Sequence, residues 1–116
     1  MKLNPSEQQV ADCLDGLHLA WEYEPNLFVL EEHEDGTIKE GFRPDFYIPK
    51  YDAYIEVTMA RQAHTTRKNR KARLMRQLYP GTFVELIYRH HFEDLKQRIL
   101  EILEDAQNDS LRLPTG

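Results

Sequence analysis

The stretch Arg43–Thr58, with the sequence RPDFYIPKYDAYIEVT, decides how the rest of the chain can fold. Asp45 follows a proline and precedes an apolar run, and Glu56 lies inside a second apolar run. The intervening PKYD segment begins with proline, which is typical of a turn. The pattern predicts two neighbouring strands, Phe42–Ile48 and Tyr54–Val57. We expect Asp45 inside the first strand and Glu56 near the end of the second.

Short strand-like runs also precede this stretch. Trp21–Glu24 alternates between aromatic and acidic residues and stops at a proline, and Leu27–Leu30 is apolar. The dipeptide Asp35-Gly36 lies in the charged segment that follows and is favoured in hairpin turns. Together with the two strands of the central stretch, these runs predict an antiparallel meander.

A helix is predicted at the beginning of the chain. Asn4 can cap it, Pro5 suits the first helical position, and Glu7 stands where a capping box needs an acidic residue. The apolar stripe of this helix consists of Val10, Leu14 and Leu17. Glu7 lies one turn earlier on the same stripe, so its carboxylate needs either the capping box or a charged partner or metal.

The second half of the chain is predicted to contain two helices and one strand. A helix over Arg67–Tyr79 is expected to be capped by Thr65 or Thr66 and to end before a Pro-Gly pair. The apolar run Phe83–Tyr88 predicts a strand. The final helix is indicated by a periodic apolar stripe made of Phe92, Leu95, Ile99, Ile102 and Ala106.

This order of elements predicts an α/β fold with a mixed central sheet of about four or five strands flanked by helices. A strand that follows a crossover helix pairs parallel to an earlier one, so the strand at residues 83–88 is expected to be parallel. With 116 residues, the chain is long enough for one core. We expect a single domain at residues 1–107 and a flexible C-terminal tail at 108–116.

Composition indicates a soluble cytoplasmic protein without a membrane partner. The chain is 41% hydrophobic and 30% charged, as is ordinary for globular domains. The single cysteine, Cys13, rules out an internal disulfide and fits a reducing compartment. The sequence contains no apolar run of about 18 residues, and its N-terminus lacks the apolar core of a signal peptide.

The formal charge of −5 hides a segregated distribution. Residues 1–56 contain 13 acidic and 4 basic residues, whereas residues 57–116 contain 7 acidic and 11 basic ones. Seven basic residues and no acidic one lie between Arg61 and Arg76. Such a block can bind a polyanion, although it is also compatible with a solvated helix face.

The two carboxylates of the central stretch indicate a divalent-metal site for phosphodiester hydrolysis. Carboxylate oxygens from Asp45 and Glu56 are suitable Mg²⁺ ligands, and the backbone carbonyl of Val57 can add another oxygen. Glu7 is a further candidate ligand from the first helix. The histidines show no metal-ligand spacing and the chain has no cysteine pair, so a zinc site is not expected.

Pro44-Asp45 followed by Glu56-Val57-Thr58 resembles the PD-(D/E)XK nuclease superfamily, particularly its small resolvase-like and endonuclease-like members. The resemblance extends over about residues 5–105. It implies a restriction endonuclease-like fold and Mg²⁺-dependent cleavage of DNA, with branched or junction DNA among the substrates and Mn²⁺ as a substitute. It also implies a homodimer, in which two sites cut two strands. Thr58 occupies the position of the usual lysine, which is compatible with an inactive binding fold, a tolerated substitution or a lysine supplied from elsewhere.

A lysine from the following helix is expected to replace the missing one, as in some members of this superfamily. On a wheel of about 100° per residue, Leu74, Met75 and Leu78 mark the apolar face. Lys71 then falls in the middle of this face and Lys68 at its edge. We therefore expect Lys71 first and Lys68 second as the catalytic cation. The alternative is that both lysines extend past the apolar surface into solvent.

The remaining basic residues of the block suit contacts with DNA phosphates, which position a duplex without reading its sequence. These residues are Arg61, Arg67, Arg70, Arg73 and Arg76. Two other functions stay open. The chain can be an inactive nuclease fold that binds DNA or supports an assembly, or a protein-interaction domain that uses its basic helix.

Overall fold

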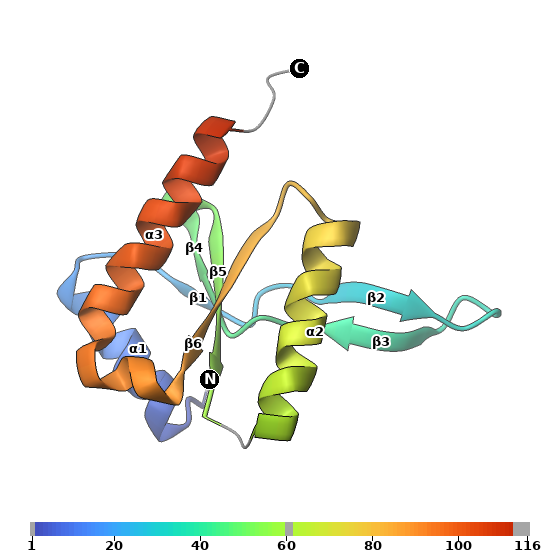
Figure 1. Cartoon of the computed structure of the whole chain (residues 1–116), viewed down its shortest axis with the longest axis horizontal. Coiled ribbons are helices and arrows are strands. Elements are labelled where there is room, and N and C mark those ends of the chain that lie inside the picture. The colour runs from blue at the N-terminus through green and yellow to red at the C-terminus, as the bar shows by residue number, and fades with distance from the viewer. Residues whose placement is uncertain (1, 60–61, 113–116) are drawn as a thin grey trace.

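The computed structural model describes residues 2–59 and 62–112, and within them it forms a mixed α/β fold (Figure 1). The helices are α1 (Pro5–Gly16), α2 (Gln62–Leu78) and α3 (Leu95–Arg112). The strands are β1 (Glu22–Tyr23), β2 (Phe28–Glu32), β3 (Ile38–Phe42), β4 (Phe46–Ile48), β5 (Ala53–Thr58) and β6 (Phe83–Tyr88). Two short 3₁₀ helices are η1 (Pro49–Tyr51) and η2 (Arg89–Asp94).

The central sheet has four strands in the order β1-β4-β5-β6. β4 pairs antiparallel with both β1 and β5, whereas β5 and β6 are parallel and are connected through α2. The sheet is therefore mixed, and the predicted parallel strand after a crossover helix is confirmed. Because β5 and β6 run in the same direction, their carboxyl ends lie at one edge of the sheet.

Helices cover both faces of the sheet (Figure 1). α1 and α3 pack on one face, where Ile55 and Val57 of β5 join the larger apolar core. α2 packs on the other face, where Tyr54 joins a second apolar cluster. Side chains alternate along a strand, so Glu56 and Thr58 lie on the same face as Tyr54, beneath α2. The face of β5 that carries Glu56 is thus positioned against the basic helix α2.

The predicted meander is wrong in one respect, since β2 and β3 pair only with each other and form a separate two-stranded sheet. This hairpin projects from the body of the molecule beyond α2 (Figure 1). Its turn contains the expected Gly36, whose φ of 88° is readily adopted only by glycine. The His33 N–H donates to the Thr37 carbonyl and closes the turn at 2.8 Å.

The predicted strand Phe42–Ile48 is divided into two. β3 ends at Phe42 and β4 begins at Phe46, so Asp45 lies just before a strand rather than inside one. Pro44 has no N–H to donate to a ladder and restricts the residue that precedes it, which explains the break. The Asp45 backbone N–H, free of a strand partner, donates instead to the side chain of Glu56.

Two helix boundaries also differ from the prediction. α2 begins at Gln62, so Thr65 and Thr66 lie inside the helix and do not cap it. α3 continues through Arg112, into the segment predicted to be a flexible tail. The sequence contains no proline or glycine in residues 62–66 or in residues 108–112, so neither helix is interrupted there. Within the part of the chain that the structure describes, no helix has the length and apolar character needed to cross a membrane.

Candidate metal and active site

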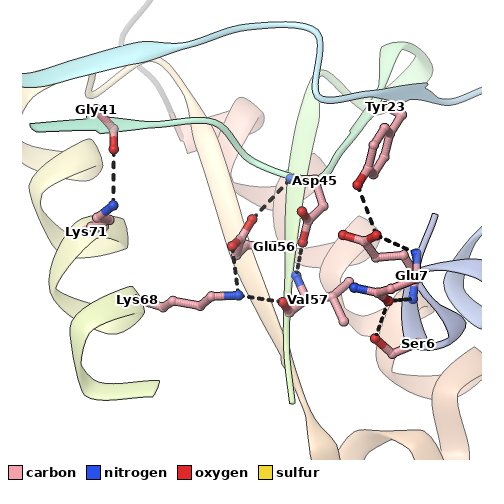
Figure 2. A network of polar contacts seen from close by, with 10 residues as sticks. Ser6, Glu7, Tyr23, Gly41, Asp45, Glu56, Val57, Lys68 and Lys71 are labelled. Atoms are coloured by element: carbon pink, nitrogen blue, oxygen red, sulfur yellow. Dashed lines mark hydrogen bonds and ion pairs between the residues drawn. The ribbon is translucent and has the colours of Figure 1, made fainter. Parts of the chain in front are cut away.

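Asp45, just before β4, and Glu56, near the carboxyl end of β5, lie side by side (Figure 2). The Asp45 N–H donates to Oε1 of Glu56 at 3.1 Å, and the Val57 N–H donates to Oδ2 of Asp45 at 2.8 Å. Asp45 is 8% exposed and Glu56 is 7% exposed. The Glu56 side chain is thus held by the backbone of Asp45, and the Asp45 side chain by the backbone of Val57, the residue after Glu56.

Lys68 of α2 reaches these carboxylates. Its Nζ lies 3.1 Å from Oε2 of Glu56 and donates to the Val57 carbonyl oxygen at 2.8 Å (Figure 2). Among the residues that the structure describes, it is the only cationic side chain that forms an ion pair with either carboxylate. The ammonium therefore connects a carboxylate oxygen and a carbonyl oxygen that the sequence named as metal ligands.

Lys71, the lysine that the sequence ranked first, points elsewhere. Its Nζ donates to the Gly41 carbonyl oxygen of β3 at 3.2 Å (Figure 2). The predicted apolar face was rotated because it included Leu78, which is 50% exposed. Among the α2 side chains that the structure describes, from Thr66 onward, the buried ones are Ala72 and Met75. Lys68 lies within about 10° of their direction on the helical wheel, whereas Lys71 lies about 70° from it.

Of the interpretations that the sequence left open for Glu7, the structure shows the capping box, and a metal at Glu7 stays a prediction. Glu7 forms the capping box with Asn4, since the Asn4 N–H donates to Glu7 Oε1 at 3.0 Å and the Glu7 N–H donates to Asn4 Oδ1 at 2.8 Å. The hydroxyl of Tyr23 also donates to Glu7 Oε1, at 3.0 Å. The carboxylate is nevertheless buried next to Asp45, whose pKa it helps to raise (Figure 2).

The electrostatics of the site are unfavourable for a second negative charge. Burial, followed by the charge of Glu56, raises the pKa of Asp45 to about 9, although the Val57 N–H opposes this shift. Burial also raises the pKa of Glu56, and the Lys68 ammonium acts in the opposite direction. Burial and the hydrogen bond to Glu7 raise the pKa of the Tyr23 hydroxyl. The folded site therefore keeps Asp45 protonated up to a higher pH than the unfolded chain does, unless a further cation lies beside it.

The donor set fits a hard divalent cation. Asp45 and Glu56 offer carboxylate oxygens and Val57 offers a carbonyl oxygen, which are the ligand types that Mg²⁺ and Mn²⁺ prefer. Asp45 itself has no ion pair with any described cationic side chain. In the described part of the chain, no group of three or more His, Cys, Asp or Glu residues is arranged to hold a metal. A cation here would therefore depend on two carboxylates, the carbonyl and water, as Mg²⁺ sites commonly do.

The arginines predicted to contact phosphates divide into three kinds. Arg67 and Arg73 are exposed on α2. Arg70 forms an ion pair with Glu40 of β3 at 2.6 Å, and Arg76 lies 3.7 Å from a carboxylate oxygen of β6. Arg61 lies outside the described residues. Two of the expected phosphate contacts thus already have acidic partners within the chain.

Sequence reasoning missed two residues near this edge of the sheet. Tyr23 of β1 holds Glu7, and no local pattern indicated that an aromatic residue sixteen positions away would contact it. Arg89 donates from Nη2 to the Met59 carbonyl at 2.8 Å, just beyond the end of β5. The parallel pairing of β5 with β6 was a usable signal for Arg89, because residues that follow parallel strands meet at the same edge.

Comparison of the chain with protein-family models, with curated proteins and with solved structures gave no match. The resemblance to PD-(D/E)XK nucleases therefore rests on the residues of this chain.

Proposed function

We propose that the protein is a Mg²⁺-dependent endonuclease that hydrolyses phosphodiester bonds in DNA. The observation that carries this proposal is the convergence of two buried carboxylates, a backbone carbonyl and a lysine ammonium. Burying carboxylates together is unfavourable unless a cation compensates them. A fold that keeps Asp45 and Glu56 in this arrangement is explained by a function that needs both.

Each residue of the site has a distinct role in this proposal. Asp45, Glu56 and the Val57 carbonyl hold the cation, and Glu7 supports Asp45 from α1. When bound, Mg²⁺ neutralises charge on the phosphate and makes a water molecule more acidic. Lys68 stabilises negative charge that develops on the phosphate and orients the attacking water. Mn²⁺ has the same ligand preference and is expected to replace Mg²⁺.

Substrate binding is assigned to the exposed face of α2. Arg67 and Arg73 are exposed there and are suited to phosphate contacts, which carry little sequence information. A domain of 116 residues covers little duplex alone, so two copies are proposed to act together on two strands. Branched or junction DNA is the proposed substrate, and the cytoplasm is the proposed compartment.

The experiment that tests this function is cleavage of supercoiled plasmid and of a synthetic four-way junction in Mg²⁺ or Mn²⁺. The wild type should nick or cut these substrates, and Asp45→Ala should not. Asp105→Asn, which changes an exposed acidic residue of α3, is the matched control and should cleave normally. Circular dichroism should show the same fold in all three proteins. Equal cleavage by the wild type and Asp45→Ala would contradict the proposal.

A second candidate function is DNA binding without cleavage. It is favoured by the position of Lys68, whose ammonium already occupies the Glu56 and Val57 oxygens that a metal would use. In this case the wild type would bind duplex or junction DNA but leave it intact in Mn²⁺. Binding without nicking, measured on the same preparation, would select this alternative.

A further inference from the structure

Thr58 is a buried polar residue whose hydroxyl has no partner in the described protein. It is 1% exposed, and its Oγ1 forms no hydrogen bond with any described residue. All six residues of β5 are buried, so valine, which has nearly the same shape, would suit this position better on packing grounds alone. A buried hydroxyl without a partner is costly, and this one therefore needs an explanation.

The surroundings of Thr58 place the hydroxyl beside the candidate site. Thr58 follows Glu56 by two positions on the same face of β5, beneath α2. Its register partner on β6 is Tyr88, whose hydroxyl bonds Asn69 of α2. Lys68, the residue before Asn69, contacts Glu56. Thr58 thus lies next to Glu56 along one face of β5, beneath the part of α2 that carries Lys68.

We infer that Thr58 positions a water molecule between its hydroxyl, the Glu56 carboxylate and the Lys68 ammonium. A buried water needs two to four polar partners. Here the Glu56 carboxylate can accept a hydrogen bond from the water, the Lys68 ammonium can donate one to it, and the Thr58 hydroxyl can do either. The inference rests on the proposed nuclease function, for which this water is the nucleophile. Thr58 is a positioning residue, because it acts on the substrate only through the water.

The reaction balances with this water as the attacking group. Its oxygen forms the new bond to phosphorus, and the bond from phosphorus to the leaving sugar oxygen breaks. One proton of the water passes to solvent, and the leaving oxygen takes a proton from solvent. Lys68 stays an ammonium throughout, and Thr58 fixes the direction from which the water approaches.

The test compares Thr58→Val and Thr58→Ser with the wild type. Thr58→Val should lower kcat for Mg²⁺-dependent DNA cleavage by about 10-fold or more, while KM for DNA stays within about twofold. Thr58→Ser, which keeps the hydroxyl, should restore kcat to within about threefold of the wild type. Thr82→Val, which changes a partly buried threonine in the loop between α2 and β6, is the matched control and should leave kcat unchanged.

Thermal unfolding gives a second readout, which distinguishes a Thr58 hydroxyl that binds a water molecule from one that has no hydrogen-bond partner. If the hydroxyl has no hydrogen-bond partner, Thr58→Val removes an unsatisfied buried group and should raise the melting temperature by about 4 °C or more. If it holds a water, the melting temperature should not rise. Unchanged kcat in Thr58→Val, or a clear rise in its melting temperature, overturns this inference alone. A wild type that does not cleave overturns the proposed function and this inference together.

Discussion

Replacing Asp45 by asparagine is expected to stabilise the metal-free protein while it removes the cation site. Asparagine has the same shape, and its carbonyl oxygen can still accept the Val57 N–H that Asp45 accepts at 2.8 Å. What the exchange removes is a carboxylate buried beside those of Glu56 and Glu7. A residue that lowers stability and persists in the fold is typical of a functional site.

The magnitude follows from the pKa of Asp45, which is raised from its ordinary value of 3.8 to about 9. One pKa unit corresponds to about 1.4 kcal/mol, so at pH 7 this carboxyl lowers the stability of the folded state by about 4 kcal/mol. Asparagine does not recover all of this free energy, because its side-chain amide also needs hydrogen-bond partners. We therefore expect Asp45→Asn to raise the free energy of unfolding by about 3 kcal/mol at pH 7.

The sign of the pH dependence is fixed by the direction of the shift. The folded protein binds the Asp45 proton more tightly than the unfolded chain, so stability falls as pH rises from about 4 to about 9 through this group. Asp45→Asn removes this contribution, and Glu56, whose pKa is also raised, adds to the slope that remains. The stability difference between the variant and the wild type should therefore grow from pH 5 to pH 8.

Urea unfolding in EDTA at pH 5, 7 and 8 measures this difference. Asp105→Asn, at an exposed position of α3, is the control and should follow the wild type at each pH. Mg²⁺ should then stabilise the wild type but not Asp45→Asn, because only the wild type retains the site. An Asp45→Asn variant that is less stable than the wild type at pH 8 would refute the reasoning, since the carboxyl would then be stabilising.

Three further predictions concern the other charged residues. Lys68→Met should slow Mg²⁺-dependent cleavage by about 100-fold, whereas Lys71→Met should change the rate by no more than about threefold. Single-turnover rates on one duplex measure both effects. A larger effect of Lys71→Met would instead favour Lys71 as the catalytic cation, as the sequence predicted. The double exchange Arg67→Ala and Arg73→Ala should weaken DNA binding for all sequences and lower the slope of log K against log salt by about two, measured by fluorescence anisotropy; an unchanged slope would remove α2 from the DNA interface. Glu7→Gln keeps a residue that can complete the capping box, so it should change the melting temperature little. It should weaken Mn²⁺ binding about 10-fold, as measured by calorimetry. An unchanged Mn²⁺ affinity would mean that Glu7 only caps the helix.

The sequence was informative where local patterns determine structure. A short apolar run located β5 and placed Glu56 near its end, and the Asp35-Gly36 dipeptide located the hairpin turn. The capping box at Glu7 was readable because all its members lie within four residues. The mixed sheet followed from the order of elements, because a strand after a crossover helix has few ways to pair.

Long-range packing explains what the sequence could not predict. Leu78, the last residue of α2, is half exposed, and treating it as buried favoured Lys71 over Lys68. The separate sheet formed by β2 and β3 depends on where the chain turns at Pro44, which no periodicity reveals. The partners of Arg70 and Arg76 lie on other strands, so their ion pairs were not visible in the charge pattern.

Crystals of the wild type soaked in Mn²⁺ test the central claim most directly, because manganese can be located by its anomalous scattering. We predict a manganese ion in contact with the carboxylates of Asp45 and Glu56 and with the Val57 carbonyl, with the Lys68 ammonium moved off that carbonyl. The same soak of Asp45→Asn should show no ion at this point. A wild type without manganese there, or a variant that binds it equally well, would contradict the account.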